Sequence, residues 1–268
     1  MIRTVVIGAG GRMGRRLVAN ILESETLSLA GALEYPGCPL VGTDAGSLAG
    51  CAPAGVAITD DLKAVLANAD AVIDFATGSI AEVAETCAAA GVAMVIGTTA
   101  LPAEEKKLLS DLAAKGAKIV QAYNMSVGVN LLFKLVKEAA EILGTQYDAE
   151  VIEMHHNLKK DAPSGTAVRL AEQICDAWGW DYDKDVRHGR EGIVGARTAS
   201  EIGMHSMRGG DVVGDHTVVF ATGGERIELT HKASSRDTFA KGALRAVRFL
   251  CNAAPGKVYD MQDVLGLR

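Results

Sequence analysis

Short apolar runs alternate with helical segments over the first 121 residues, and this alternation limits the folds open to the chain. The segments between the runs, such as residues 80–89 and 103–114, place apolar residues at helical spacing. Parallel strands covered by helices on both faces are almost wholly apolar. The pattern therefore predicts an α/β fold with a doubly wound parallel sheet. Its expected strands, rich in Val and Ile, are residues 4–7, 27–33, 56–58, 71–75, 92–96 and 118–121.

The pattern changes after Asn124, in a chain whose 268 residues suit two domains. Helices are expected at residues 130–143 and from Thr166, and strands at 149–154, 198–207, 212–221 and 225–231. The Gly-Gly punctuation favours hairpin connections, so we expect a smaller α+β domain with a mostly antiparallel sheet. A last helix at 238–252 has no expected strand after it and should pack back on the first domain. The predicted domains are residues 1–125 with 236–268, and residues 126–235.

A glycine-rich turn follows the first expected strand and opens a helix. It reads Gly8-Ala9-Gly10-Gly11-Arg12-Met13-Gly14, with Met13 where a strict G-x-G-x-x-G fingerprint has its last glycine. Such a turn lets the backbone approach a pyrophosphate at a helix N-terminus, and Glu34, at the end of the second strand, is placed to accept from ribose hydroxyls. The alternative is a turn without a ligand. The context favours a Rossmann-type dinucleotide site formed by Gly8, Ala9, Gly10, Gly11, Arg12, Met13 and Glu34.

The choice between NADH and NADPH depends on the charge beside Glu34. Tyr35 follows it, so no cation there awaits the extra phosphate of NADPH, although Arg12 keeps dual specificity open. Two other strand ends are expected at the cofactor, because ligands bind beyond the carboxyl ends of parallel strands. The alternative is that they are ordinary turns that cap the next helix. These two strand ends are the turn at 75–78 and Gly97, Thr98 and Thr99. Separately, a nicotinamide or the domain hinge is expected after the sixth strand, at Ala122, Tyr123, Asn124 and Met125.

Two imidazoles, two ammonium groups and an anion-friendly turn lie within residues 153–167. The adjacent His155 and His156 should point to opposite sides of a strand end, which makes a poor metal chelate but allows a proton donor and a separate substrate contact. The turn at 163–166 leads into a helix whose first amides suit a carboxylate. The alternatives are structural histidines and a solvated charge run, but the clustering indicates an active site without a metal. The remaining histidines, interpreted as structural, are His188, His205, His216 and His231.

Charge and cysteine content narrow the class of partner. A formal net charge of −6 disfavours a general nucleic-acid or acidic-membrane surface. Five cysteines, without a Cys-x-x-Cys pair, indicate free thiols in a reducing compartment. No signal peptide or membrane span is expected. We therefore expect a cytoplasmic protein that acts on a small molecule.

Several segments together resemble the 4-hydroxy-tetrahydrodipicolinate reductase family, also called dihydrodipicolinate reductase. They are GAGGRMG at 8–14, Glu34, IGTT at 96–99, NMSVGVN at 124–130, HHNLKKDAPSGTA at 155–167 and HKASSR at 231–236, and the match runs from Ile2 to about Leu265. The histidine segment is the most specific of them. Two departures concern cofactor fit: Ala100 stands where a glycine is expected, and Tyr35 where some members carry a basic residue.

The resemblance implies an NAD(P)H-dependent oxidoreductase of lysine and diaminopimelate biosynthesis that reduces a cyclic imine dicarboxylate. It implies that His155 is the acid/base and Lys159 a companion proton donor, and that His156, Gly165 and Thr166 bind substrate. Arg236 is a further carboxylate candidate, or else the member of a structural ion pair. Residues 126–235 would bind substrate and form a homotetramer, with closure about hinges near Met125 and Ser235. The alternatives are a related two-domain dehydrogenase, such as an aspartate or homoserine dehydrogenase, and a non-catalytic nucleotide sensor.

Overall fold

The structure, a computed structural model, describes residues 1–98 and 101–268 and divides into two compact units. Unit 1 comprises Met1–Val127 and Arg236–Arg268, and unit 2 comprises Gly128–Ser235. Within the described ranges, every helix falls short of the length and apolarity that a membrane crossing requires.

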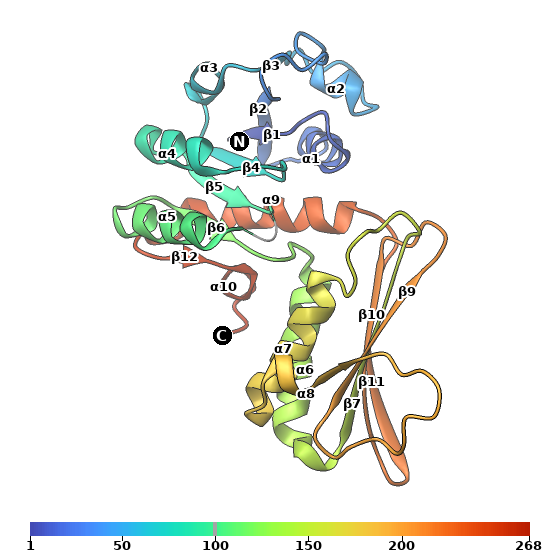
Figure 1. The fold of residues 1–268 in the computed structure, drawn as a ribbon. Helices are drawn as coiled ribbons and strands as arrows, with labels where there is room; N and C mark the ends of the chain where they lie inside the picture. The colour runs from blue at the N-terminus through green and yellow to red at the C-terminus, as the bar shows by residue number, and fades with distance from the viewer. Residues whose placement is uncertain (99–100) are drawn as a thin grey trace. The chain divides into compact units, whose positions relative to one another are not determined.

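Unit 1 contains a seven-stranded sheet in the order β12-β6-β5-β4-β1-β2-β3, in which every pairing is parallel (Figure 1). The chain builds outward from β1 through β2 to β3 and then crosses to β4 on the other side of β1. This confirms the doubly wound sheet and places the reversal of strand order between β1 and β4, where such sheets bind ligands. The strands are β1 (Ile2–Ile7), β2 (Leu27–Leu33), β3 (Ile58–Thr59), β4 (Ala71–Asp74), β5 (Ala93–Ile96), β6 (Ile119–Gln121) and β12 (Val258–Tyr259).

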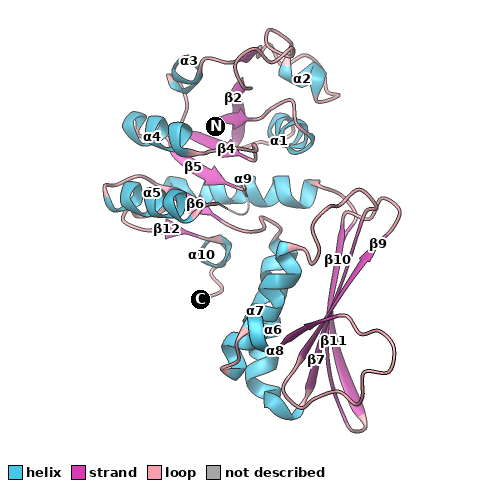
Figure 2. Cartoon of the chain, viewed as in Figure 1, coloured by secondary structure: helices cyan, strands magenta, loops and turns pink. Residues whose placement is uncertain are grey.

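Helices cover both faces of this sheet, as Figure 2 shows. Alternate strand residues face opposite ways, so Val6 and Ile73 pack in one core with α1 and α9, while Val5 and Val72 pack in another with α4 and α5. Both faces are apolar for that reason. The helices are α1 (Arg12–Leu22), α2 (Ala45–Leu48), α3 (Leu62–Leu66), α4 (Ala81–Ala90), α5 (Ala103–Ala114), α9 (Asp237–Asn252) and α10 (Met261–Leu265).

The expectation that no strand follows the last long helix is wrong. After α9 the chain forms β12, which pairs with β6 through Val258 and Tyr259. A strand of two residues is too short to leave an alternating or continuous apolar pattern in the sequence. Its formation places β12 at the edge of the sheet beside β6.

Unit 2 is a five-stranded sheet, in the order β11-β10-β7-β9-β8, with two long helices on one face. The helices α6 (Val127–Leu143) and α7 (Gly165–Trp178) bury Leu132, Phe133, Leu170 and Ile174 against the sheet. A 3-10 turn at Gly144–Gln146 and the short helix α8 (Tyr182–Asp185) complete the unit. The strands are β7 (Asp148–His155), β8 (Val186–His188), β9 (Ile202–Arg208), β10 (Gly214–Thr222) and β11 (Glu225–Ala233).

This second sheet is mixed, which corrects the expectation of mostly antiparallel strands joined by hairpins. The strand β10 pairs antiparallel with β11 and with β7, but β7 and β8 both pair parallel with β9. Parallel neighbours need crossover connections, and α7 and the loop at residues 189–201 supply them. Of the strands for which the sequence predicted hairpins, only β10 and β11 are joined by one.

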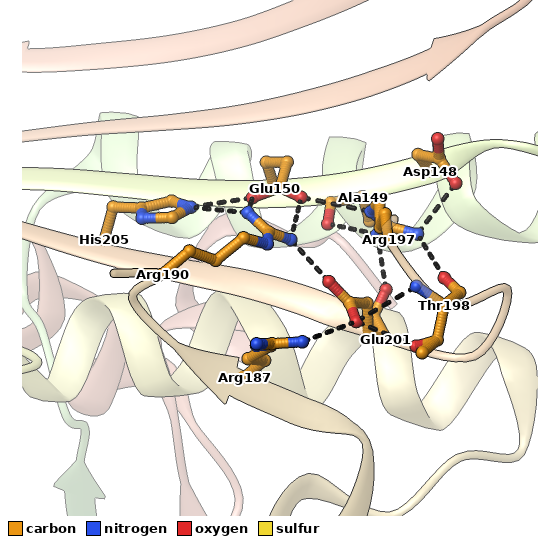
Figure 3. A network of polar contacts seen from close by, with 9 residues as sticks. All are labelled: Asp148, Ala149, Glu150, Arg187, Arg190, Arg197, Thr198, Glu201 and His205. Atoms are coloured by element: carbon orange, nitrogen blue, oxygen red, sulfur yellow. Dashed lines mark hydrogen bonds and ion pairs between the residues drawn. The ribbon is translucent and has the colours of Figure 1, made fainter. Parts of the chain in front are cut away.

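An ionic network anchors the loop at residues 189–201 to the sheet face opposite the two helices (Figure 3). Arg190 bonds both Glu150, at 2.8 Å, and Glu201, at 2.5 Å, while Arg197 Nε bonds Glu150 at 3.1 Å. His205 Nε2 lies 2.7 Å from the other oxygen of Glu150. Burial would raise the pKa of Glu150, but hydrogen bonds from Arg190, His205 and Arg197 lower it to about 2. The network therefore stays charged at neutral pH and holds both ends of the loop.

Candidate active site

In unit 1 the glycine turn joins β1 to α1 with its helix N-terminus open. Gly8 has a φ of +68°, and a Cβ at Gly14 would lie 2.0 Å from the carbonyl oxygen of Gly8. Both positions therefore need glycine, one for the turn and one for close packing of helix on strand. Gly11 is the N-cap of α1, and no side chain caps the helix there. These features fit a pyrophosphate bound by the first amides of α1.

Glu34 closes one side of this turn. Its Oε1 accepts a hydrogen bond of 2.7 Å from the amide of Gly10, which leaves the second carboxylate oxygen for a ribose hydroxyl. Tyr35 is 64% exposed, and Arg12 is exposed and has no ion pair in the described part of the chain. The carboxylate of Glu34 is thus fixed at the turn. Arg12, the cation that would meet a 2′-phosphate, is not fixed by an ion pair in the described part of the chain.

The other expected cofactor loops meet the glycine turn at the carboxyl ends of β4 and β5. Thr98 Oγ1 donates to the carbonyl of Ala76 at 2.9 Å, and a Cβ at Gly97 would lie 2.4 Å from the ring of Phe75. A Cβ at Gly8 would approach that of Ala76 to 3.2 Å. Three strand ends therefore converge here, as the topology predicts. Thr99, the remaining candidate of this loop, and Ala100 lie outside the described residues.

The four residues expected to form the cofactor site after β6 differ in their burial and in their contacts. Ala122 is buried, and its amide bonds the carbonyl of Ile96 at 3.3 Å. Tyr123 is half exposed, with Lys106 Nζ 5.8 Å from its ring centroid, and Asn124 Oδ1 accepts from the amide of Ser126. Met125 directs its side chain into the core of unit 1. Any contact of Met125 with a nucleotide would therefore be through its backbone.

In unit 2 the strand β7 carries Glu153 and His155 on the face that the helices cover. Alternation along the strand puts them in line with the apolar Ala149 and Val151, so a carboxylate and an imidazole continue a buried row. Glu153 is fully buried, and its Oε2 lies 2.5 Å from His155 Nδ1. Its Oε1 accepts from the amide of Ser164 at 3.3 Å. One carboxylate thus bonds both the histidine and the turn that begins α7.

Glu153 is ionised despite its burial. Burial would raise its pKa, but hydrogen bonds from His155, Arg208 and Ser206 outweigh that effect and lower the pKa to about 2. Arg208 Nη1 lies 2.9 Å from Oε2, the same oxygen that meets His155. The register between β7 and β9 explains why these side chains meet. Ser206 on β9 is the partner of Glu153, and Arg208 on β9 is the partner of His155.

Lys159 belongs to the same cluster through Asp161. Lys159 Nζ lies 2.9 Å from both carboxylate oxygens of Asp161, and only 20% of its side chain is exposed. Arg208 Nη2 donates to the carbonyl of Asp161 at 2.6 Å. Burial opposes the ionisation of Asp161, but the hydrogen bond from Lys159 keeps its pKa below the usual value. The ammonium group is therefore held near Arg208 and Glu153 on a restrained loop.

His216 lies beside His155 from the neighbouring strand. Their rings meet edge to face with centroids 5.2 Å apart, and His216 Nε2 is 3.1 Å from Ser164 Oγ. Ser164 is also the N-cap of α7, accepting from the amide of Ala167. Burial, followed by the charge of His155, lowers the pKa of His216 to about 3. His216 is therefore a neutral imidazole that supports the catalytic candidate.

Three of the expected substrate residues lie next to members of this cluster in the sequence: His156 follows His155, and Gly165 and Thr166 follow Ser164. The amide of His156 donates to the carbonyl of Val212 at 2.7 Å, and its carbonyl accepts from the amide of Lys159. Gly165 is exposed at the start of α7, and a Cβ there would meet nothing within 4 Å. Thr166 follows it in the first turn of the helix. Arg236 belongs to unit 1, where its guanidinium has no ion pair within the described ranges.

Sequence reasoning missed Glu153, Arg208 and His216 as members of the site. Their proximity depends on strand register, which pairs Glu153 with His216 across β10 and His155 with Arg208 across β9. A usable signal was present, because Glu153 and His216 both interrupt an otherwise apolar alternating row. A polar residue at a buried position of a strand needs a partner, and a partner is what the structure supplies.

The neutral state of His216 makes a testable contribution to stability. A pKa below the unfolded value of about 6.5 stabilises the fold above that pH, and the contribution is lost as pH falls toward 3. Between pH 7 and pH 5 the loss should be about 2 kcal/mol. Urea unfolding of the wild type and of His216→Gln at both pH values measures it. The stability difference between the two proteins should shrink by that amount on acidification, and an unchanged difference contradicts the assignment.

Comparison with known proteins agrees with both units. The models for the N-terminus and the C-terminus of dihydrodipicolinate reductase match residues 2–125 and 128–265. Proteins named 4-hydroxy-tetrahydrodipicolinate reductase from Citrifermentans bemidjiense and Syntrophotalea carbinolica are 51% and 52% identical over 269 residues, covering all of both chains. The solved structure of dipicolinate-bound dihydrodipicolinate reductase from Paenisporosarcina sp. TG-14 aligns with a TM-score of 0.76 at 25% identity over 98% of each chain. The chain belongs to the dihydrodipicolinate reductase family of oxidoreductases.

Proposed function

We propose that this enzyme is a 4-hydroxy-tetrahydrodipicolinate reductase, which uses NADH or NADPH to reduce the derived cyclic imine dicarboxylate to tetrahydrodipicolinate in lysine and diaminopimelate biosynthesis. The observation that carries the proposal is the pairing of His155 with the buried Glu153 beside the first turn of α7. That arrangement provides an acid next to an anion site. The curated relatives that cover the whole chain bear this enzyme's name.

The reaction adds a hydride and a proton to the conjugated ring. When bound, NAD(P)H would supply the hydride for carbon 4, with its own oxidation to NAD(P)⁺ balancing the reduction. The product of hydride addition is an enamine, which must take up one proton, and His155 donates it. Lys159 is a companion proton donor, held within reach of the same cluster by Asp161. An imidazole is suited to this role because its ordinary pKa lies close to cellular pH.

Recognition of the two carboxylates falls to His156, Gly165 and Thr166. The first turn of α7 supports this because helix N-terminal amides and the helix dipole favour anions, and Gly165 leaves space beside them. Unit 2, residues 128–235, is accordingly the proposed substrate domain, for which the sequence predicted residues 126–235. Its sheet is also the proposed contact of a homotetramer, as the family resemblance implies.

Unit 1, residues 1–127 and 236–268, is the proposed dinucleotide domain, for which the sequence predicted residues 1–125 and 236–268. The amides at Gly10 to Met13 would hold the pyrophosphate, and Glu34 would accept from the adenosine ribose. Gly97 and Thr98 would line the same site from the neighbouring strand end. The five cysteines of the chain are free thiols, which supports a cytoplasmic location.

We expect NADH to be used at least as well as NADPH. Glu34 is fixed at the glycine turn by the Gly10 amide and would repel a 2′-phosphate, and Tyr35 offers no charge to offset it. Oxidation of the two cofactors, followed with freshly enzyme-generated 4-hydroxy-tetrahydrodipicolinate, gives the two values of kcat/KM. A preference of more than about tenfold for NADPH, worth about 1.4 kcal/mol, would show that Arg12 outweighs Glu34. No oxidation of either cofactor would refute the proposed function itself.

A further inference from the structure

We propose that Glu153 is a positioning residue, which orients the His155 imidazole for proton transfer and couples it to the first turn of α7. The proposal rests on the proposed function for the identity of the proton acceptor, but its geometry belongs to unit 2 alone. The two oxygens of Glu153 meet His155 Nδ1, Arg208 Nη1 and the amide of Ser164, and Ser206 adds a further hydrogen bond. A carboxylate with those partners has one available orientation.

The contact with Glu153 selects one tautomer of His155. An ionised carboxylate only accepts hydrogen bonds, so His155 Nδ1 must carry a proton to bond it at 2.5 Å. Nε2 is then the nitrogen that exchanges a proton with the substrate. Within the described ranges no protein group is hydrogen-bonded to Nε2. Gly214 helps to keep it open, because a Cβ at that position would lie 3.0 Å from this nitrogen.

Arg208 keeps Glu153 from holding the imidazolium too tightly. Its Nη1 bonds the same oxygen as His155, at 2.9 Å, and its Nη2 is fixed by the carbonyl of Asp161. The negative charge of Glu153 is thus shared between a permanent cation and the imidazole. His155 can therefore lose its proton to substrate without leaving an unpaired charge buried in the sheet. The other charged or titratable groups nearby are His216 and, through Asp161, Lys159.

The chain contains a matched control for this role. Glu150 is on the same strand, three residues earlier and on the opposite face, and it too accepts from arginine side chains and a histidine (Figure 3). Glu150 and Glu153 both have a pKa lowered to about 2 by such hydrogen bonds, against the effect of burial. A purely structural carboxylate at either position should therefore affect the protein in the same way when it is neutralised.

The test compares Glu153→Gln with Glu150→Gln in the full chain. Glutamine keeps the size of the side chain and an acceptor oxygen for the Ser164 amide but loses the charge. For Glu153→Gln we expect kcat to fall roughly 10- to 100-fold, with KM for the imine changed much less. Glu150→Gln should change neither quantity.

Nitrogen-15 spectra of the histidines provide a readout that needs no turnover. In the wild type, neutral His155 should be the Nδ1–H tautomer, and in Glu153→Gln it should become a mixture or the Nε2–H form. The wild-type spectrum alone is decisive if the variant does not fold, since an Nε2–H His155 in the wild type overturns the proposal. Equal loss of kcat in both glutamine variants also overturns it. A wild type that shows the Nδ1–H tautomer but does not reduce the imine instead refutes the proposed function.

Discussion

Replacement of His155 by alanine should lower kcat for the imine by roughly 10²–10⁴-fold, the range over which general acid–base catalysis contributes. The loss follows from the position of the ring, whose Nδ1 is held by Glu153 and whose edge-to-face neighbour is His216, so that Nε2 is the nitrogen left for the substrate. Binding of NADH should change little, because the glycine turn and Glu34 belong to unit 1. Steady-state kinetics with a circular dichroism check of folding measure both quantities. Near-normal turnover in a folded variant would remove His155 from the mechanism.

Substitutions of the neighbouring residues Lys159 and His156 should have effects on kcat and KM that differ from each other in the same assay. Lys159→Ala should also lower kcat, since its ammonium is held in the cluster by Asp161. His156→Ala should act mainly through KM, because a contact made equally in the ground and transition states leaves the chemical step unchanged. A drop in kcat for His156→Ala that matches the His155 variant would reverse the two assignments.

Substitution of Gly14 by alanine should destroy the dinucleotide site. The new Cβ would lie 2.0 Å from the carbonyl oxygen of Gly8 and less than 3 Å from the backbone of Ala9. Backbone atoms cannot rotate away as a side chain does, so α1 must move off β1. We expect a cost of about 3 kcal/mol or more in the free energy of unfolding. Binding of NADH should fall by at least roughly tenfold, because the displaced helix carries the amides proposed to bind the pyrophosphate.

Urea unfolding and calorimetric titration with NADH measure the two effects. Gly223→Ala is the matched control, because Gly223 lies in the turn between β10 and β11 with open space around its Cβ position and no positive φ. It should leave both quantities nearly unchanged. Normal NADH affinity in Gly14→Ala would place the pyrophosphate away from α1.

The fold of unit 1 was predictable from sequence because its strands are buried on both faces. The run of β5 is continuously apolar, β1 ends in three buried apolar residues, and segments with helical spacing lie between the runs. The strand β12 was not predicted, because two residues are too few to show a repeating pattern of apolar residues. In unit 2 the parallel pairing of β9 with β7 and β8 was not predicted, for a different reason. Alternation of apolar and polar residues shows which face of a strand is buried, but it does not show which strands are neighbours or whether they run parallel.

The candidate site was predictable where its residues are neighbours in sequence. His155, His156, Lys159 and the Ser-Gly-Thr turn form one dense segment, so clustering and family resemblance both identified it. Arg208 and His216 are more than fifty residues away from His155 along the chain and approach it only through the register of β9 and β10. The hydrogen bond from the Gly10 amide to Glu34 likewise depends on the packing of two strand ends.

The order of segments along the chain determines when each unit is complete during synthesis. Unit 2 is one uninterrupted stretch, so a ribosome has made all of it once Ser235 has been added. The core of unit 1 still lacks α9 at that moment, and with it the buried side chains of Ala243, Leu244 and Val247. The glycine turn and its sheet therefore await a helix that is translated after the whole of unit 2. Unit 2 can therefore fold before unit 1, although most of unit 1 is translated earlier, which is opposite to the N-terminal-first order usual for multidomain proteins.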